Sequence, residues 1–325
     1  MIISKTPFRI PIAGGGTDLD FYFKKKKSTF YSLAINQYVY VFLTPRTIDE
    51  KYLIQTTSTQ FAKNLNQIKH HLIRETIKFF KIKEPLHIGT YATVPTLTGL
   101  GSSSSLVVGL INCILKYKKI KMTDKKIIST AFKIEREICG NAGGWQDQII
   151  SQIGGLIKVN ISKKGVLNIK KISKKPKLIN LIKKNILLVY SKQKRQSSKV
   201  ILSQKKNLSQ VINNYDLIKS LTKEIPNIIN DGSPQLLAKL FSDHWQIKKK
   251  LSNEISNNKL NNLFNFLLKK CNFSGGKLIG AGGGGFFLMV TKNKKETIKL
   301  LKKNSISYMN FDIDYNGSRT LKSFK

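Results

Sequence analysis

Residues Pro95–Ser105 read PTLTGLGSSSS, and the apolar run Leu106–Leu115 follows directly. Gly99 and Gly101 allow backbone angles that a β-carbon forbids, so several N–H groups can converge on one point. A helix that begins here would aim its unpaired N–H groups and the positive end of its dipole at the same point. The stretch therefore predicts a phosphate-binding loop. A flexible serine linker is the alternative, but linkers are seldom flanked by a strand and a long apolar run.

This loop differs from two widespread nucleotide-binding patterns. The P-loop pattern Gly-x-x-x-x-Gly-Lys-Ser/Thr does not occur in the chain, and no lysine follows Gly101. The loop also does not match the dinucleotide pattern Gly-x-Gly-x-x-Gly at the end of a first strand. The sequence thus indicates a phosphate-binding loop of another class, in which the serine hydroxyls can bind phosphate oxygens or magnesium.

Length and composition limit the kind of protein. With 325 residues the chain can bury a sizeable core, as two domains or as one elongated unit. It has no run of eighteen apolar residues, so we expect no membrane span, and its N-terminus lacks the layout of a signal peptide. Cys113, Cys139 and Cys271 are widely spaced, which predicts free thiols. We therefore expect a cytoplasmic protein.

The net charge of +39 raises the possibility of nucleic-acid binding. Lys and Arg number 57 against 18 Asp and Glu, and such an excess attracts any polyanion at low salt. However, the lysines are spread along the whole chain between apolar positions, and no helix-turn-helix, RNA-recognition or zinc-finger signature accompanies them. We interpret the excess as compositional drift and expect no specific nucleic-acid partner. A positive field would also help to capture ATP and a phosphorylated substrate.

Hydrophobic periodicity predicts the order of helices and strands. In the first half we expect strands at Ile2–Ala13, Ser32–Leu43 and Leu86–Thr93, a hairpin at Leu156–Ile161 and Val166–Ile172, and helices at Phe61–Ile82, Ser104–Lys118 and Thr123–Cys139. Pro176 and neighbouring lysines predict a domain boundary. Beyond it we expect a strand at Ile186–Ser191, helices between Ser197 and Lys270, and a closing strand pair.

A second informative stretch, Thr6–Asp18, reads TPFRIPIAGGGTD. A strand that carries Arg9 ends in three glycines and then Thr17-Asp18, so a cation and a carboxylate stand at opposite ends of a tight backbone. On its own this pattern is ordinary, because a glycine turn before a Thr-Asp helix cap is common.

A third stretch, Glu135–Gly155, reads EREICGNAGGWQDQIISQIGG. Glu135 lies near the end of a predicted helix, where a surface carboxylate paired with Arg136 or a nearby lysine is the ordinary interpretation. Asp147 follows a glycine turn and has a helix N-cap as its ordinary interpretation.

A fourth stretch, Lys277–Val290, reads KLIGAGGGGFFLMV. A glycine block between two apolar strands allows another backbone to approach closely. A mobile hairpin turn is the alternative, but four consecutive glycines are more than a turn needs.

The order Pro-x-x-x-Gly-Leu-Gly-Ser-Ser resembles the nucleotide loop of the GHMP kinases, which include galactokinase, homoserine kinase, mevalonate kinase and phosphomevalonate kinase. The three other stretches resemble further motifs of this family and occur in the family's order. The resemblance implies an α+β fold of two domains with the active site in the cleft. It places an ATP-binding domain with a left-handed βαβ unit at residues 1–175 and a ferredoxin-like domain at 176–325.

The resemblance also implies roles for individual residues. Asp147 would orient or deprotonate the attacking hydroxyl, and Arg9 would stabilise the charge on the transferred phosphoryl group. Ser103 and Glu135 would hold Mg²⁺. The residues implied to surround the ATP phosphates are Pro95, Gly99, Leu100, Gly101, Ser102, Ser103 and Ser104. The residues implied to form the third glycine motif are Gly280, Gly282, Gly283 and Gly284.

The acceptor side departs from the galactokinase signature Arg-x-x-x-x-Gly-Glu-His-Thr-Asp. Gly15 and Gly16 stand where that signature has Glu and His, which argues against galactose and opens room for a bulkier or anionic sugar. These motifs, together with Ala34–Tyr40 (AINQYVY), most resemble members that phosphorylate a heptose 7-phosphate. Trp145 instead resembles L-fucokinase-type members, and its ring could stack on a sugar. The candidate substrate residues are Gly15, Gly16, Thr17, Asp18, Asn36, Trp145 and the cluster Lys192, Lys194, Arg195 and Ser197.

The resemblance therefore implies an ATP-dependent kinase that phosphorylates the anomeric hydroxyl of a heptose 7-phosphate to the 1,7-bisphosphate, in the synthesis of nucleotide-activated heptose. An L-fucokinase-like enzyme acting on an unphosphorylated sugar is the alternative. A nucleotide-binding protein without catalysis is a more remote one, and the joint presence of Arg9, Glu135 and Asp147 speaks against it. The expected partner is a small sugar or sugar phosphate, and the oligomeric state stays open.

Overall fold

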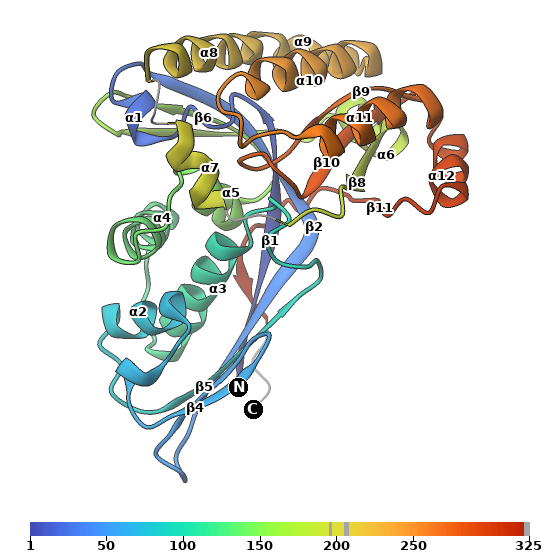
Figure 1. Cartoon of the computed structure of the whole chain (residues 1–325). Helices are drawn as coiled ribbons and strands as arrows, with labels where there is room; N and C mark the ends of the chain where they lie inside the picture. Colours follow the sequence, from blue (N-terminus) through green and yellow to red (C-terminus); the bar gives the residue numbers. More distant parts are fainter. Residues whose placement is uncertain (195–196, 205–207, 322–325) are drawn as a thin grey trace.

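The structure is a computed structural model that describes residues 1–194, 197–204 and 208–321. It contains two β-sheets, with helices packed against both (Figure 1). The larger sheet has eight strands, in the order β12-β1-β2-β5-β3-β4, with β6 and β7 continuing from β2. Its strands are β1 (Ile2–Ala13), β2 (Ser28–Pro45), β3 (Tyr52–Gln55), β4 (Thr59–Ala62), β5 (Leu86–Ala92), β6 (Leu156–Ile161), β7 (Leu167–Ile172) and β12 (Arg319–Thr320).

The long strand β2 organises this sheet. Its first third pairs with β6, and its last third pairs with β5, while β1 runs antiparallel to it along most of its length. β3 and β5 form a parallel pair, joined by a connection that includes a helix, as the implied βαβ unit requires. The chain leaves β5 directly into the serine-rich loop, so the sheet sets the position of that loop.

Two prolines interrupt the ladder of β1. The register against β2 shifts between Pro7 and Phe8, and again between Pro11 and Ala13. Proline has no N–H for a ladder hydrogen bond, and within sheets it stands at edges or bulges. Arg9 lies between the two irregularities, and its side chain is directed to the cavity described below.

Helices cover one face of the larger sheet. They are α1 (Asp20–Phe23), α2 (His71–Phe79), α3 (Ser102–Tyr117), α4 (Asp124–Phe132) and α5 (Gln146–Ile153), with a 3₁₀ turn η1 (Leu65–Gln67) and a π-helix η2 (Lys133–Ile138). α3 begins at the serine-rich loop and packs on β1 and β2. The predicted helix Thr123–Cys139 begins as expected, because the Thr123 side chain accepts a hydrogen bond from the Lys126 N–H, but it changes to the π form at Lys133.

The prediction of one helix over Phe61–Ile82 was wrong in its first half. Residues up to Ala62 form β4, which pairs with β3, and η1 separates it from α2. Apolar residues at helical spacing misled the prediction, since Ile68 and Leu72 are both buried although only Leu72 lies on α2. Strand pairing outweighed local periodicity here.

The second sheet has four antiparallel strands, β8 (Ile186–Tyr190), β9 (Phe273–Leu278), β10 (Phe286–Thr291) and β11 (Tyr308–Met309), in the order β11-β8-β10-β9. Helices lie between β8 and β9 and between β10 and β11, so the chain follows a βαββαβ course with spatial order 4-1-3-2. This is the predicted ferredoxin-like arrangement. Its helices are α7 (Ser197–Ser203), α8 (Leu208–Ser220), η4 (Leu221–Glu224), α9 (Ile225–Asp231), α10 (Pro234–Lys249), α11 (Asn258–Lys270) and α12 (Lys294–Lys303).

The chain changes sheet between β7 and β8, through the unpredicted helix α6 (Pro176–Asn185). Our division into residues 1–175 and 176–325 coincides with the start of this helix and stays a proposal. After β11 the chain returns to the larger sheet, where Ile313 bridges to Ile35 and β12 pairs with β1. The end of the chain is therefore tied to its beginning.

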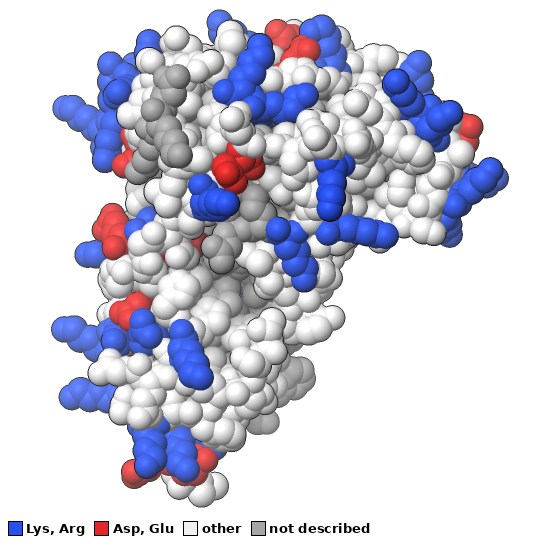
Figure 2. Space-filling view, viewed as in Figure 1, with Lys and Arg blue, Asp and Glu red and all other residues white. Residues whose placement is uncertain are grey.

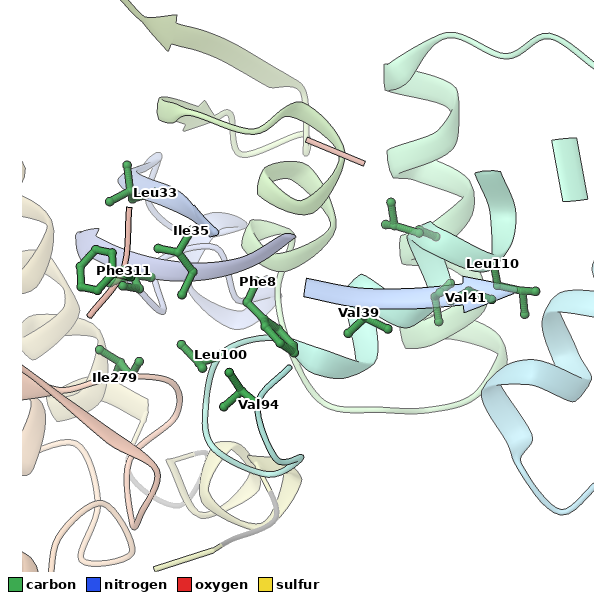
Figure 3. Close-up of a cluster of buried hydrophobic side chains, with 14 of the residues drawn as sticks. Phe8, Leu33, Ile35, Val39, Val41, Val94, Leu100, Leu110, Ile279 and Phe311 are labelled. Carbon is green, nitrogen blue, oxygen red and sulfur yellow. The ribbon is translucent and has the colours of Figure 1, made fainter. Parts of the chain in front are cut away.

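One hydrophobic cluster joins the loops of both sheets (Figure 3). Leu100 in the serine-rich loop and Ile279 at the end of β9 are both about 1% exposed, and they belong to the same cluster as Phe8 on β1. Burying such side chains stabilises each by about 1.5–3 kcal/mol. Apolar residues inside glycine-rich segments thus anchor those segments to the core.

Basic side chains are distributed widely over the surface. On the face shown in Figure 2, Lys and Arg occur in separate groups over both the upper and lower parts of the molecule, with Asp and Glu between some of them. Within the described part of the chain, none of the helices has both the length and the apolar character needed to cross a bilayer.

Gly109 on α3 tests the contact between helix and sheet. Replacing a helical glycine by alanine usually stabilises a protein by about 0.5–1 kcal/mol. Here a β-carbon would lie 2.8 Å from Thr6 Oγ1 and 2.9 Å from Ser4 Oγ, so we expect Gly109→Ala to lower the melting temperature through overpacking worth about 1–3 kcal/mol. Lys116→Ala, at an exposed position of the same helix, should leave it nearly unchanged. An equal or higher melting temperature for Gly109→Ala in calorimetry would contradict this packing.

Candidate active site

A cavity lies where the end of β1, the serine-rich loop, α5 and the second sheet with its helices meet. It contains many of the residues that the sequence singled out. Of these, the lining includes Arg9, Gly15, Gly16, Asp18, Gly99, Gly101, Ser102, Ser103, Asp147, Ser197 and Gly280. All four stretches that the sequence singled out therefore contribute to one site.

Arg9 connects three parts of this site. Its Nε and Nη2 donate to the two carboxylate oxygens of Asp147, each at 2.7 Å, and its Nη1 donates to the carbonyl oxygen of Gly99 at 2.5 Å. The two side chains are 8% and 18% exposed. Such a bidentate pair fixes the planes of both groups as well as their distance. It therefore holds Asp147 on α5 at a set position relative to the serine-rich loop.

The serine-rich loop has the backbone that the sequence predicted. Gly99 and Gly101 have φ angles of +81° and +85°, in the left-handed region that favours glycine. Gly101 is the N-cap of α3, so the free N–H groups of the first turn lie at the cavity. A β-carbon on Gly101 would be 3.3 Å from both Arg9 Cγ and Asp147 Oδ2, so the loop crosses directly over this ion pair.

The four serines of the loop divide into two groups. Ser102 and Ser103 line the cavity. Ser104 and Ser105 are buried: Ser104 Oγ donates to Glu135 Oε2 at 2.6 Å, and Ser105 Oγ donates to Pro7 O at 3.0 Å. The first pair is available to a ligand, and the second pair attaches α3 to its neighbours.

Two other residues assigned to the ATP phosphates have different surroundings. Leu100 is buried in the hydrophobic cluster described above. Pro95 borders a separate hollow beside Tyr190 and Phe286, and its carbonyl oxygen accepts a hydrogen bond from Thr98 Oγ1 at 2.9 Å. These two residues contribute to the shape of the loop.

Glu135 is completely buried on η2. Its Oε2 accepts hydrogen bonds from Ser104 Oγ and, at 2.7 Å, from Gln148 Nε2, while Oε1 lies 3.2 Å from Arg136 Nη1. The ion pair with Arg136 matches the ordinary interpretation, but the carboxylate is inside the protein and not on its surface. A π-helical turn reorients side chains relative to an α-helix, and such turns are frequent at functional sites.

The surroundings of Glu135 are compatible with a magnesium ligand. Among the described residues no group donates a hydrogen bond to the buried atom Oε1, although the Arg136 charge is close to it. Mg²⁺ in kinases is typically held by one or two protein oxygens together with phosphate oxygens and water. Oε1 of Glu135 is a suitable ligand atom in this respect, but Glu135 is not among the residues that line the cavity, whereas Ser103 is.

The glycine turn after β1 forms the opposite wall. Gly15 and Gly16 line the cavity, and a β-carbon on Gly16 would be 2.5 Å from Cε1 of Tyr215. Thr17 is buried behind the wall, where its hydroxyl donates to Gly14 O at 2.8 Å. Tyr215, which sequence reasoning missed, therefore occupies space that a side chain at position 16 would fill.

Asp18 supports the helix that carries Asp147. Its Oδ2 accepts a hydrogen bond at 2.9 Å from the N–H of Gln146, the first residue of α5. Burial raises the pKa of Asp18, the Gln146 N–H lowers it, and the charge of Asp147 raises it again. Asp147 itself lies in the first turn of α5, so it is not the N-cap that the ordinary interpretation required.

Other candidate substrate residues lie away from the cavity wall. Asn36 lies at the irregularity of β2, where its Oδ1 accepts from the Asp312 N–H at 2.7 Å. The Trp145 ring stacks on Phe132, with centroids 3.6 Å apart and planes 5° apart. Lys192 Nζ donates to Ser305 O, and Lys194 is exposed. Arg195 lies outside the described residues.

The glycine block of the fourth stretch, Gly280–Gly285, packs against the serine-rich loop, as its composition suggested. A β-carbon on Gly280 would lie 2.8 Å from Gly99 Cα, and one on Gly285 would lie 2.3 Å from Thr98 O. Gly282 and Gly283 instead contact Ile255, and Gly284 contacts Gln193. The block thus fills the space between the loop and the second sheet.

Several lining residues carry no sequence signal strong enough to identify them. Gln146 Nε2 is buried without a hydrogen-bond partner among the described residues, so it is a free donor at the cavity. It adjoins Asp147 in sequence, which could have suggested it. Arg136 and Lys277 lie inside stretches that the sequence singled out, but neither was assigned to the site. Other polar lining residues lie on helices of the second half, where no motif marks them; they are Gln204, Tyr215, His244 and Lys248.

The contact between Gly280 and Gly99 gives a prediction. The new methyl group of Gly280→Ala would displace the serine-rich loop. Overpacking of this kind costs about 1–3 kcal/mol, so we expect about ten- to a hundredfold weaker binding of a non-hydrolysable ATP analogue. Gly140→Ala is the matched control, because Gly140 has almost the same φ (+69° against +70°) but nothing within 4 Å of its β-carbon position. Equal effects of the two substitutions in calorimetry would contradict the prediction.

Comparison with known proteins agrees with this geometry. A family model for the GHMP kinases N terminal domain matches residues 66–155. The chain is 27% identical to the D-glycero-alpha-D-manno-heptose 7-phosphate kinase of Campylobacter jejuni, over 98% of both chains. It is 30% identical to the bifunctional fucokinase/GDP-fucose pyrophosphorylase of Arabidopsis thaliana, over 72% of this chain and 22% of that one.

The fold also matches solved structures. The crystal structure of a D-glycero-D-manno-heptose 1-phosphate kinase from Bacteroides thetaiotaomicron covers all of both chains, with a TM-score of 0.83 and 20% identity. The family-model match and the full-length similarity to a kinase decide the family, and the loop, the ion pair and the glycine block at one cavity agree with them. The chain belongs to the GHMP kinase superfamily, and it is an ATP-dependent kinase.

Proposed function

We propose that this kinase, which acts on a sugar, phosphorylates the anomeric hydroxyl of a heptose 7-phosphate to give the 1,7-bisphosphate. The observation that carries the proposal is the similarity to a heptose 7-phosphate kinase over 98% of both chains. Residues 1–175 would supply the ATP-binding domain and 176–325 the second domain. The product is a precursor of nucleotide-activated heptose.

The acceptor sugar is proposed to bind between the glycine turn and α5. Gly15 and Gly16 leave this wall free of side chains and lie beside Asp18 and Gln146. Gln146 offers its unpaired Nε2 to a sugar oxygen. Asp18 acts mainly through the N–H of Gln146, so its role is to position α5 more than to bind the sugar.

Asp147 is proposed to accept the proton of the attacking hydroxyl. Each carboxylate oxygen has two lone-pair directions, and each oxygen of Asp147 uses one of them for Arg9. The hydroxyl oxygen attacks the γ-phosphorus of ATP, the bond from that phosphorus to the bridging oxygen breaks, and ADP leaves. The proton passes to the carboxylate of Asp147.

Arg9 is proposed to stabilise the charge of the transferred group. A guanidinium has five N–H donors, and three of those of Arg9 bind Asp147 and Gly99 O. Nη1 and Nη2 each retain one N–H that can reach the phosphoryl oxygens. Phosphoryl transfer depends mainly on positioning and charge stabilisation of this kind.

The N–H groups at the start of α3, with Ser102 and Ser103, are proposed to bind the ATP phosphates. Ser103 and Glu135 would hold Mg²⁺, which when bound neutralises charge on the β- and γ-phosphates. Leu100, Pro95 and Ser104 serve this side indirectly, because they anchor or shape the loop.

An enzyme that phosphorylates an unphosphorylated sugar such as L-fucose is the second candidate. The similarity to a fucokinase at 30% identity supports it. The proposed stacking of Trp145 on a sugar does not add support, since that ring already stacks on Phe132.

A substrate panel separates the two candidates. We expect ADP release with D-glycero-D-manno-heptose 7-phosphate and little with L-fucose, galactose or mevalonate, because the acceptor wall lacks the side chains of the galactokinase signature. Product analysis by ³¹P NMR should show a new phosphate on the anomeric carbon. Turnover of fucose alone would favour the second candidate, and turnover of none of the four would exclude both.

Substituting Asp147 tests its role. Asp147→Asn keeps the shape of the side chain but removes the charge and the proton acceptor, so kcat should fall about 10²- to 10⁴-fold while sugar binding changes little. Asp49→Asn is the control, because Asp49 forms a similar two-bond pair with Arg46 away from the cavity. Wild-type kcat in Asp147→Asn, or lost binding with unchanged turnover, would exclude the proposed role.

A further inference from the structure

Three basic side chains form one corner of the cavity without a role in the chemistry above. Lys277 lies on β9, and His244 and Lys248 lie one turn apart on α10. All three line the cavity, with exposures of 1%, 3% and 8%. Lysine is almost never buried to this degree unless it has a partner.

The side-chain contacts of Lys277 are with neutral groups. Lys277 Nζ donates to Ile12 O at 2.7 Å, lies 3.3 Å from His244 Nδ1 and is 4.9 Å from the centre of the Phe241 ring. Lys248 Nζ donates to Leu278 O at 3.0 Å and to Gly280 O at 2.6 Å. The ion pairs of the described residues include none with Lys277, whereas Arg9 and Arg136 at the same cavity each contact a carboxylate.

A purely structural role accounts for Lys277 poorly. Carbonyl oxygens satisfy hydrogen bonds, but they do not compensate a buried positive charge, whose removal from water costs several kcal/mol. Burial lowers the pKa of Lys277 well below its usual range, and the nearby charge of Lys248 lowers it further. Burial and then the two lysines lower the pKa of His244 in the same way. An anion in the cavity would compensate the positive charge and raise the pKa values of Lys277 and His244 again.

The corner lies between the two substrate regions. Lys277 binds the carbonyl of Ile12, just before the glycine turn of the proposed acceptor wall. Lys248 binds the carbonyl of Gly280, and Gly280 packs on Gly99 of the serine-rich loop. A phosphate group there could come from the acceptor or from ATP.

We propose that Lys277, Lys248 and His244 form a subsite for a phosphate group of a bound substrate. This inference rests on the proposed function, in which both substrates carry phosphate. It differs from the expectation from the sequence, which put a phosphate near Lys192 and Lys194; both of these residues are exposed. The His244 Nδ1 atom faces Lys277 at 3.3 Å, so the two side chains belong to the same subsite.

The test uses Lys277→Met, which keeps the length of the side chain and removes the charge. Calorimetry measures the affinity of the full-length protein for AMP-PNP, heptose 7-phosphate and unphosphorylated heptose. We expect a loss of about ten- to a hundredfold for one phosphorylated ligand, and no loss for heptose itself. A loss for heptose 7-phosphate identifies the acceptor phosphate, and a loss for AMP-PNP identifies that of ATP. Affinities within twofold of wild type for all three ligands overturn the proposal.

The matched control is Lys250→Met, two residues beyond Lys248 and exposed, which should change none of these affinities. His244→Gln provides a second variant if Lys277→Met does not fold, with a smaller loss for the same ligand. The wild-type protein supplies an independent measurement: calorimetry in two buffers of different ionisation enthalpy should show proton uptake on binding that ligand, because its phosphate raises the lowered pKa values of Lys277 and His244. No proton uptake with either phosphorylated ligand overturns the proposal.

Turnover separates this inference from the proposed function. If wild-type protein does not phosphorylate heptose 7-phosphate but Lys277→Met weakens binding of AMP-PNP or of inorganic phosphate, the substrate assignment fails and the subsite stands. If wild type turns heptose 7-phosphate over and the variant binds every ligand normally, the function stands and the subsite fails.

Discussion

The guanidinium of Arg9 makes the contacts on which the geometry of this site depends. It donates to both oxygens of Asp147 and to the carbonyl of Gly99, so one planar group joins β1, the serine-rich loop and α5. Removing one partner of a buried pair costs about 3–5 kcal/mol because the other charge is left uncompensated. The other features of the site support this arrangement. Pro7 and Pro11 mark the irregularities of β1 on either side of Arg9, and Asp18 fixes the start of α5.

The two glycine-rich segments combine backbone angles that favour glycine with fixed apolar anchors. Gly99, Gly101 and Gly280 adopt φ angles that favour glycine, and Gly280 and Gly99 approach so closely that a β-carbon would not fit. Leu100 and Ile279, inside these same segments, are buried in the central cluster. The glycines therefore give the loops their path, and the apolar residues hold that path in place. Both sheets contribute to this cluster, so packing in the core and the position of the serine-rich loop are connected.

Sequence reasoning succeeded where a motif has a local physical cause. The positive φ angles of Gly99 and Gly101 and the helix that follows are consequences of glycine and of an apolar run. It failed where the outcome depends on distant partners. Phe61 belongs to a strand because β3 is beside it, Trp145 stacks on Phe132, and Asn36 binds the backbone of Asp312. The roles of Trp145, Asn36 and the other candidate site residues stay predictions.

The amino-acid sequence by itself determined the backbone of the serine-rich loop, the order of most helices and strands, and the family, because these depend on residue types within short windows. The tertiary structure alone decided which side chains share the cavity. Ser103 faces it while Ser104 turns to Glu135, and Lys277 and Lys248 meet there from β9 and α10 although the chain has many other lysines. The loop PTLTGLGSSSS thus sets the path of the backbone at the start of α3, where we propose that phosphate binds. What surrounds this point follows from contacts between distant segments, such as Lys277 with Ile12, 265 residues apart, whose burial and charge no local pattern encodes.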